Sequence, residues 1–133
     1  MGAVVPRPVA AQTTFTVNSV EDPGDGICDA IQCTLAEAIL AANASVGADT
    51  IAFDIAGTGP HSIELDGSLP TVTEQVTIDG YTQPGAQENT AVVGTNAILL
   101  VEIDGSNAGD ALSIDADDSV VRGLVINRAN DGI

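Results

Sequence analysis

The 133-residue chain has no Lys and no Trp, and it has only three Arg, one His, one Tyr and two Phe. Against these few positive charges stand 19 Asp and Glu residues, which give a formal net charge of -16 at pH 7. Because a nucleic-acid site needs a basic surface, this deficit argues strongly against nucleic acid as a partner, and anionic membranes are disfavoured for the same reason. The shortage of aromatic residues leaves Val, Ile, Leu and Ala to build the core.

The sequence also lacks a long apolar run, so it predicts no membrane-spanning segment and no membrane insertion. Residues 1–12 contain two prolines and no continuous apolar stretch, which is not the pattern of a complete signal peptide. We interpret them as a flexible arm or as the remnant of a processed leader.

Cysteine is scarce as well, with only Cys28 and Cys33. The single histidine, His61, cannot complete a four-ligand zinc site with them, and their spacing is not that of a C-x-x-C redox motif. The remaining interpretation is a local disulfide formed in an oxidising compartment. This predicts a secreted protein, extracellular or at the cell surface.

What the chain does contain is a recurring short motif. An apolar residue, any residue, a second apolar residue and then Asp or Asn follow one another, which predicts a strand of three or four residues ended by a turn. Most of the repeats from residue 51 onward lie about a dozen residues apart, and we interpret one gap of twice that length as two units with one strand altered. The motifs begin at Phe15, Ile51, Ile63, Val76, Val101, Leu112 and Leu124.

Strands this short and this regular fit an antiparallel sandwich or a wound coil in which later strands stack on earlier ones. The units resemble one another and repeat Ile, Leu and Val at interior positions, which favours the coil. We therefore predict an all-β fold, a parallel β-helix (β-solenoid), with its turns in residues 51–133 and open at the C-terminal end.

One segment departs from the β pattern. Thr34 and Glu37 have the spacing of a capping box, in which each side chain satisfies a free backbone N–H at a helix start. The apolar residues that follow fall on one helical stripe, which predicts a short helix over residues 34–44. We interpret residues 13–50 as an N-terminal cap whose helix covers one end of the coil. The stripe consists of Leu35, Ala38, Ile39 and Ala42.

The segment from Cys33 to Ile39, followed by Ala42-Asn43 and by the stretch from Ala48 to Ile51, resembles the CSLREA-type domain. Domains of this type open many bacterial extracellular parallel β-helix proteins. The resemblance implies a right-handed parallel β-helix of the pectin-lyase-like type over roughly residues 14–133, exported and often attached to the cell surface. It implies no particular activity. Ala36 stands where the family usually has Arg, so any salt bridge of that Arg is absent.

Clustered carboxylates are the candidate metal ligands. Glu21, Asp22, Asp25 and Asp29 lie within nine residues and are interspersed with glycines. Such a loop suits Ca²⁺, which prefers carboxylate oxygens, although the spacing is not that of an EF-hand. A second cluster consists of Asp115, Asp117 and Asp118. The competing interpretation for both is a solvated acidic turn, and calcium is the one cofactor that the sequence suggests.

Residues able to act as a catalytic base are few. Arg122 and Arg128 are the basic residues of the predicted coil, and the lone His61 has no evident nucleophile to activate. We therefore predict no enzymatic activity. The function we expect is that of an extracellular structural or adhesive module, self-associating head-to-tail into a filament through the open end. The alternative is a carbohydrate-binding or polysaccharide-lyase-like domain truncated from a larger secreted enzyme, with a cell-surface glycan as its partner.

Overall fold

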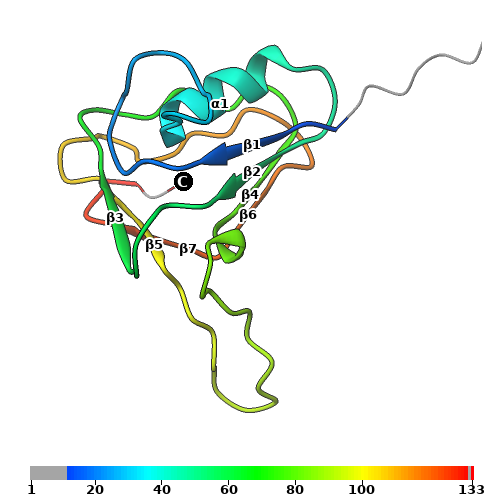
Figure 1. Ribbon diagram of the computed structural model, residues 1–133, viewed down its shortest axis with the longest axis vertical. Coiled ribbons are helices and arrows are strands. Elements are labelled where there is room, and N and C mark those ends of the chain that lie inside the picture. The colour runs from blue at the N-terminus through cyan, green and yellow to red at the C-terminus, as the bar shows by residue number, and fades with distance from the viewer. Residues whose placement is uncertain (1–11, 132) are drawn as a thin grey trace, which may run out of the picture.

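The protein is mainly β, with little helix (Figure 1). The computed structural model describes residues 12–131 and 133, so the predicted arm or leader remnant of residues 1–12 lies outside them except for its last residue. The described elements are β1 (Thr14–Val17), α1 (Leu35–Ala44), β2 (Asp49–Phe53), β3 (His61–Glu64), β4 (Val76–Asp79), the 3-10 turn η1 (Gly80–Thr82), β5 (Val101–Asp104), β6 (Val120–Arg122) and β7 (Leu124–Asn127).

The strands form two parallel sheets. One has the order β1-β2-β4-β6 and the other has the order β3-β5-β7. From β2 onward, successive strands alternate between the two sheets, so that each strand pairs with the strand two places further along the chain. Every pairing between these strands is parallel, and the alternative of an antiparallel sandwich is therefore wrong.

Pairing places apolar residues beside apolar residues in neighbouring strands. In the first sheet Phe15 lies beside Ile51, which lies beside Ile78. In the second sheet Ile63 lies beside Ile103. Ile51, Ile78, Ile63 and Ile103 are all wholly buried, and neighbouring strands are about 4.8 Å apart. Continuous columns of branched side chains therefore make up much of the core, which explains how a chain so poor in aromatic residues can fill it.

One predicted strand is absent, and one observed strand lies outside the recurring motif. The motif that begins at Leu112 forms no strand, although Ile114 makes an isolated parallel bridge with Val72. Only two backbone hydrogen bonds hold this contact, from Val72 N to Ser113 O and from Asp115 N to Val72 O. Conversely, β6 lies at Val120–Arg122, which the recurring motif does not mark.

The double-length gap in the repeat contains η1 and a long excursion, residues 84–100, which we call the projecting loop. In Figure 1 it extends away from the body of the molecule between η1 and β5. Just before this loop, side chains make the hydrogen bonds that a neighbouring strand would otherwise make. The buried Gln83 accepts from Ile55 N through Oε1 and donates to Ile55 O through Nε2, each at 2.9 Å. Thr82 Oγ1 accepts from Phe53 N at 2.7 Å.

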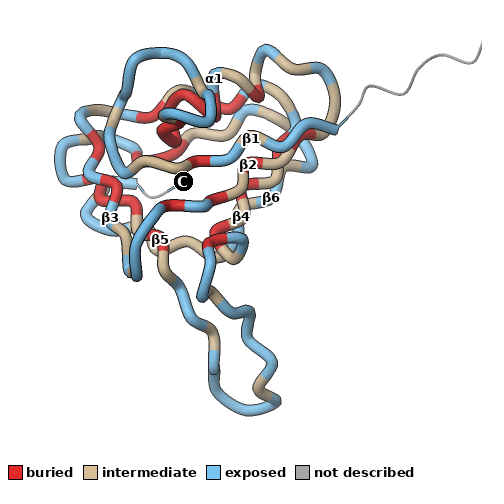
Figure 2. Tube along the Cα trace, viewed as in Figure 1, coloured by how far each residue is buried: buried red, intermediate tan, exposed pale blue. Residues whose placement is uncertain are grey.

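The helix α1 covers the core beside β1 and β2, which it contacts. Its buried side chains include Leu35 and Ile39, which belong to the same hydrophobic cluster as Val17 and Ile51. Figure 2 shows buried positions concentrated in α1 and along the strands, whereas the projecting loop is exposed almost throughout. Within the described residues, no helix has the length and apolar character needed to cross a membrane.

Candidate functional site

A disulfide joins Cys28 to Cys33 at the start of the helix region. Cys33 is fully buried and Cys28 is partly buried against the core. Asn18, which follows β1, fixes the loop that the disulfide closes: its Oδ1 accepts from Cys33 N at 2.7 Å, and its Nδ2 donates to Asp29 O at 3.3 Å and to Ala30 O at 3.2 Å. The disulfide loop is thereby fastened to the end of the first strand.

Replacing both cysteines with serine is expected to lower the free energy of unfolding by about 2 kcal/mol. The bond closes a loop with a sequence separation of 5, and the chain-entropy model assigns a loop of this size about that much. Urea unfolding of the oxidised protein, the reduced protein and the double variant would measure the loss. Equal midpoints for all three would show that the Asn18 hydrogen bonds suffice without the bond.

The capping box at the start of α1 is formed in both directions. Thr34 Oγ1 accepts from Glu37 N at 3.2 Å, and Glu37 Oε1 accepts from Thr34 N at 2.8 Å. The second carboxylate oxygen of Glu37 reaches further and accepts from Gly26 N at 2.6 Å and from Ile27 N at 2.9 Å. One buried carboxylate therefore connects the helix start to the preceding loop.

The charged state of Glu37 is favoured in the folded protein. Burial raises the pKa of this carboxyl, but hydrogen bonds from the Thr34 N–H and the Gly26 N–H lower it, so that the pKa lies below the ordinary 4.5. Gly24 lies directly over the group, because a Cβ at this position would meet the Glu37 carboxylate at 2.6 Å. The Glu37 carboxylate is therefore a tightly enclosed anion that backbone N–H groups stabilise.

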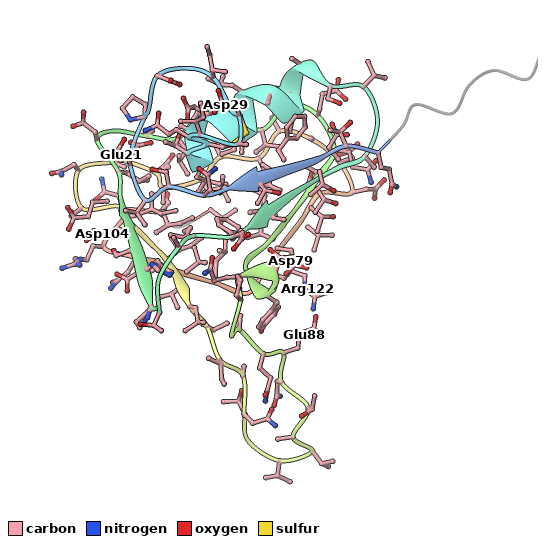
Figure 3. The ribbon with its side chains drawn as sticks, viewed as in Figure 1. Glu21, Asp29, Asp79, Glu88, Asp104 and Arg122 are labelled. Carbon is pink, nitrogen blue, oxygen red and sulfur yellow. A yellow bond between two sulfur atoms is a disulfide. The ribbon has the colours of Figure 1, made fainter. Side chains whose placement is uncertain are left out.

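The four carboxylates predicted as calcium ligands are not gathered into one ligand set. Asp22 Oδ2 accepts from Asp66 N, and Asp25 Oδ1 accepts from Ile27 N. Asp29 Oδ1 accepts from the N–H groups of residues 31 and 32, and Glu21 accepts from the Gln32 amide. Figure 3 shows Glu21 and Asp29 at separate places on the loop. Across residues 12–131, no group of three or more His, Cys, Asp or Glu side chains has an arrangement that could hold a metal ion, which applies to Asp115, Asp117 and Asp118 too.

The arginines of the described chain both contact acidic residues. Arg122 pairs with Glu88 of the projecting loop and lies 3.6 Å from Asp79, and its guanidinium stands 5.3 Å from the centre of the Tyr81 ring (Figure 3). Arg128 Nη2 lies 2.6 Å from Asp104 Oδ2.

Asp104 is the second carboxyl whose charged form is favoured. The Ser106 N–H donates to it at 3.0 Å and lowers its pKa, desolvation raises it, and Arg128 lowers it again, so that the pKa lies below the ordinary 3.8. His61 Nε2 lies 3.3 Å from Gly57 O. The contact of Arg128 with Asp104 joins the end of β7 to β5, whereas the contacts of Ser106 and Gly57 are local to their own turns.

A polar depression of about 400 Å³ lies beside β1 and the disulfide loop. Threonine hydroxyls, the Asn18 amide and the carboxylates of Asp29 and Asp54 line it, and Phe15 contributes to its wall. Phe15 belongs to the column that continues into Ile51 and is packed against the core, so its ring is not a free platform for a sugar.

The end of the body formed by β6 and β7 is more open than the layers before it. Val121 continues the column of Ile78, and Ile126 continues the column of Ile103. Ile78 and Ile103, their neighbours in the preceding strands, are wholly buried, whereas Val121, Leu124 and Ile126 are only half-buried. Among the described residues, β6 and β7 each pair with a strand on one side only. The end thus presents aliphatic side chains together with strand edges.

The projecting loop is the other exposed apolar feature. Val92 is fully exposed and Val93 is 90% exposed, and Ile98 and Leu99 at its return are also in solvent. The spacing of the repeat predicts two units here with one strand altered, and it does not indicate that the chain leaves the body. Comparisons of the chain with protein-family models, with curated proteins and with solved structures gave no match.

Proposed function

We propose that the chain is an extracellular structural or adhesive module, a right-handed parallel β-helix that self-associates through the end formed by β6 and β7. The observation that carries the proposal is the register of the two sheets, in which each strand lies beside the strand two places on and aliphatic residues stack on aliphatic residues. Successive layers of a solenoid contact only their neighbours in the same way. The resemblance of the cap to the CSLREA-type domain agrees with this proposal.

The disulfide supports the extracellular location, because bonds of this kind persist in oxidising compartments and are rare in the cytosol. The strongly acidic composition supports a structural role in solution, since a large net charge opposes unspecific association. Two molecules with so large a net charge of the same sign associate only where their surfaces match in shape and hydrogen bonding.

Among the described residues, the end at β6 and β7 has the features that such a surface needs. An unpaired strand edge is a template for another strand, and half-buried aliphatic side chains gain free energy when a further layer covers them. Two of these ends facing each other would give a closed dimer, whereas one end meeting the β1 edge of the next molecule would give a filament. Because α1 packs beside β1, the filament requires the incoming layer to fit around the helix.

Changing Ile126 to Asp is expected to abolish self-association, because it places a charge in the centre of the contact. Light scattering and negative-stain electron microscopy over a range of protein concentrations would measure the assembly. Val46→Asp is the matched control, since Val46 is 75% exposed in the turn between α1 and β2 and belongs to neither β6 nor β7. A wild-type protein that stays monomeric at high concentration would refute self-association through this end.

A further inference from the structure

The first strand, β1, has a free edge of its own. Thr13 O accepts from Thr50 N, so Thr13 directs its backbone toward β2. Because successive residues of a strand direct their N–H and C=O groups to opposite sides, those of Thr14 and Thr16 face away from β2. Among the described strands, β1 pairs with β2 alone. The cap end of the first sheet is therefore able to accept a parallel strand.

The register of the first sheet specifies which residues such a strand would meet. One column of this sheet runs from Phe15 through β2 and β4 to Val121. When β1 of a second copy takes the place after β6 in the same register, its Phe15 lies beside Val121 and its Thr14 lies beside Val120. The column then continues unbroken from one molecule into the next.

The two ends also differ in charge. Both arginines of the described chain lie in the last layer, Arg122 in β6 and Arg128 directly after β7, whereas residues 12–50 contain no Lys or Arg. Asp29 and Asp54 line the depression beside β1, and neither forms an ion pair with another described residue. Opposite charges therefore meet when the β6 end of one copy faces the β1 end of the next, whereas two β6 ends facing each other bring the arginines together.

Apolar side chains accompany both edges. Val121, Leu124 and Ile126 are half-buried at the last layer. At the cap end, Ile31 of the disulfide loop is 93% exposed next to the depression beside β1. Contact between the two ends would remove aliphatic surface of both from water, which is favourable.

We propose that the surface contacted by the β6 and β7 end is the β1 end of a second copy, with β1 pairing parallel to β6 in the register of the sheet. The inference rests on the proposed function and names the partner surface of that same end. In this register Arg122 lies beside Thr16 of the next copy, which lines the depression together with Asp29 and Asp54. Each molecule has one end of each kind, so the contact repeats along one axis and gives an open filament.

Cysteine cross-linking tests the pairing directly. Residues paired in neighbouring strands lie about 4.8 Å apart, a separation that a disulfide can span. The full chain with Thr14→Cys and Val120→Cys is oxidised at a protein concentration at which light scattering detects assembly. We expect a ladder of covalent dimers, trimers and larger species on denaturing, non-reducing gels, and mainly monomer for each single variant. Val93→Cys with Val120→Cys is the control, since Val93 is 90% exposed on the projecting loop, and it is expected to give no ladder.

Reversing one charge tests the contact of Arg122 with the depression. Asp54→Arg places a positive charge opposite Arg122 and is expected to weaken assembly at least tenfold, although it lowers the net negative charge of the molecule. Glu74→Arg changes the net charge equally at a position just before β4, which has a strand on both sides. This control is expected to leave assembly unchanged or to strengthen it.

A covalent dimer from Val120→Cys alone, as abundant as the products of the double variant, would mean that two β6 ends meet and would overturn the inference. Equal effects of Asp54→Arg and Glu74→Arg would overturn it too. Assembly without the ladder overturns this inference alone, whereas a wild-type protein that stays monomeric overturns the proposed function as well. Far-ultraviolet circular dichroism verifies that every variant is folded.

Discussion

Replacing Gly80 with Ala is expected to lower the free energy of unfolding by about 3 kcal/mol, because the added methyl group has no space. A Cβ at Gly80 would lie 2.7 Å from the carbonyl carbon of Gly123 and 2.7 Å from Leu124 Cδ2. The leucine side chain can turn away, but the backbone of Gly123 cannot. It follows β6 directly, and β6 is held against β4 by the pairing of Asp79 with Arg122.

Gly109→Ala is the matched control for this effect. Its added Cβ would have Ser68 Oγ at 4.0 Å as its nearest neighbour, so the change is expected to alter stability by no more than about 0.5 kcal/mol. Urea unfolding monitored by circular dichroism would compare the two variants with the wild type. Equal midpoints for Gly80→Ala and Gly109→Ala would mean that the turn after β4 and the turn after β6 do not touch as described.

Glu37→Gln is expected to lower the free energy of unfolding by about 2 to 3 kcal/mol, because it removes a buried charge that accepts hydrogen bonds from three backbone N–H groups. The carboxylate accepts from Thr34 N with one oxygen and from Gly26 N and Ile27 N with the other. An amide has only one oxygen. Whichever way it is turned, its NH₂ group faces an N–H donor and leaves that donor without an acceptor. Glu64→Gln, at an exposed position, is the control and is expected to have little effect.

The same carboxylate predicts how stability depends on pH. Its pKa is lower in the folded protein than the ordinary 4.5, so its contribution is complete above the unfolded-state pKa and is lost as the pH falls through the folded-state value. Acid should therefore weaken the wild type more than Glu37→Gln below about pH 4.5. Urea midpoints at a series of pH values test this expectation, and parallel curves for the two proteins would contradict it.

The sequence predicted the local features of the fold well. Six of the seven predicted triplets overlap observed strands, and the helix begins at the predicted cap residue, Thr34. Each of these features depends on residues a few positions apart, where the alternation of a strand or the spacing of a helix acts directly. The disulfide between Cys28 and Cys33 is local in the same sense.

The features that the sequence did not predict depend on partners far apart in the chain. Gln83 replaces a strand neighbour for Ile55, and Asn18 holds the disulfide loop, yet neither side chain stands out in a turn-rich sequence. The acids around residue 25 are close in sequence, but each accepts hydrogen bonds from a different group, because proximity along a loop does not decide where side chains point.

The antiparallel bridge between Gln87 and Ile98 brings the outgoing and returning chain together before the projecting loop begins its excursion. The residues beyond that bridge add no member to the columns of the core, whose register is set by the strand pairings within the two sheets, and they meet β6 through the pair of Glu88 with Arg122. Doubling the length of a loop costs only about 0.6 kcal/mol in closure entropy. The position is therefore a natural insertion point, at which evolution or a protein engineer can graft a foreign segment while the body beneath stays unaltered.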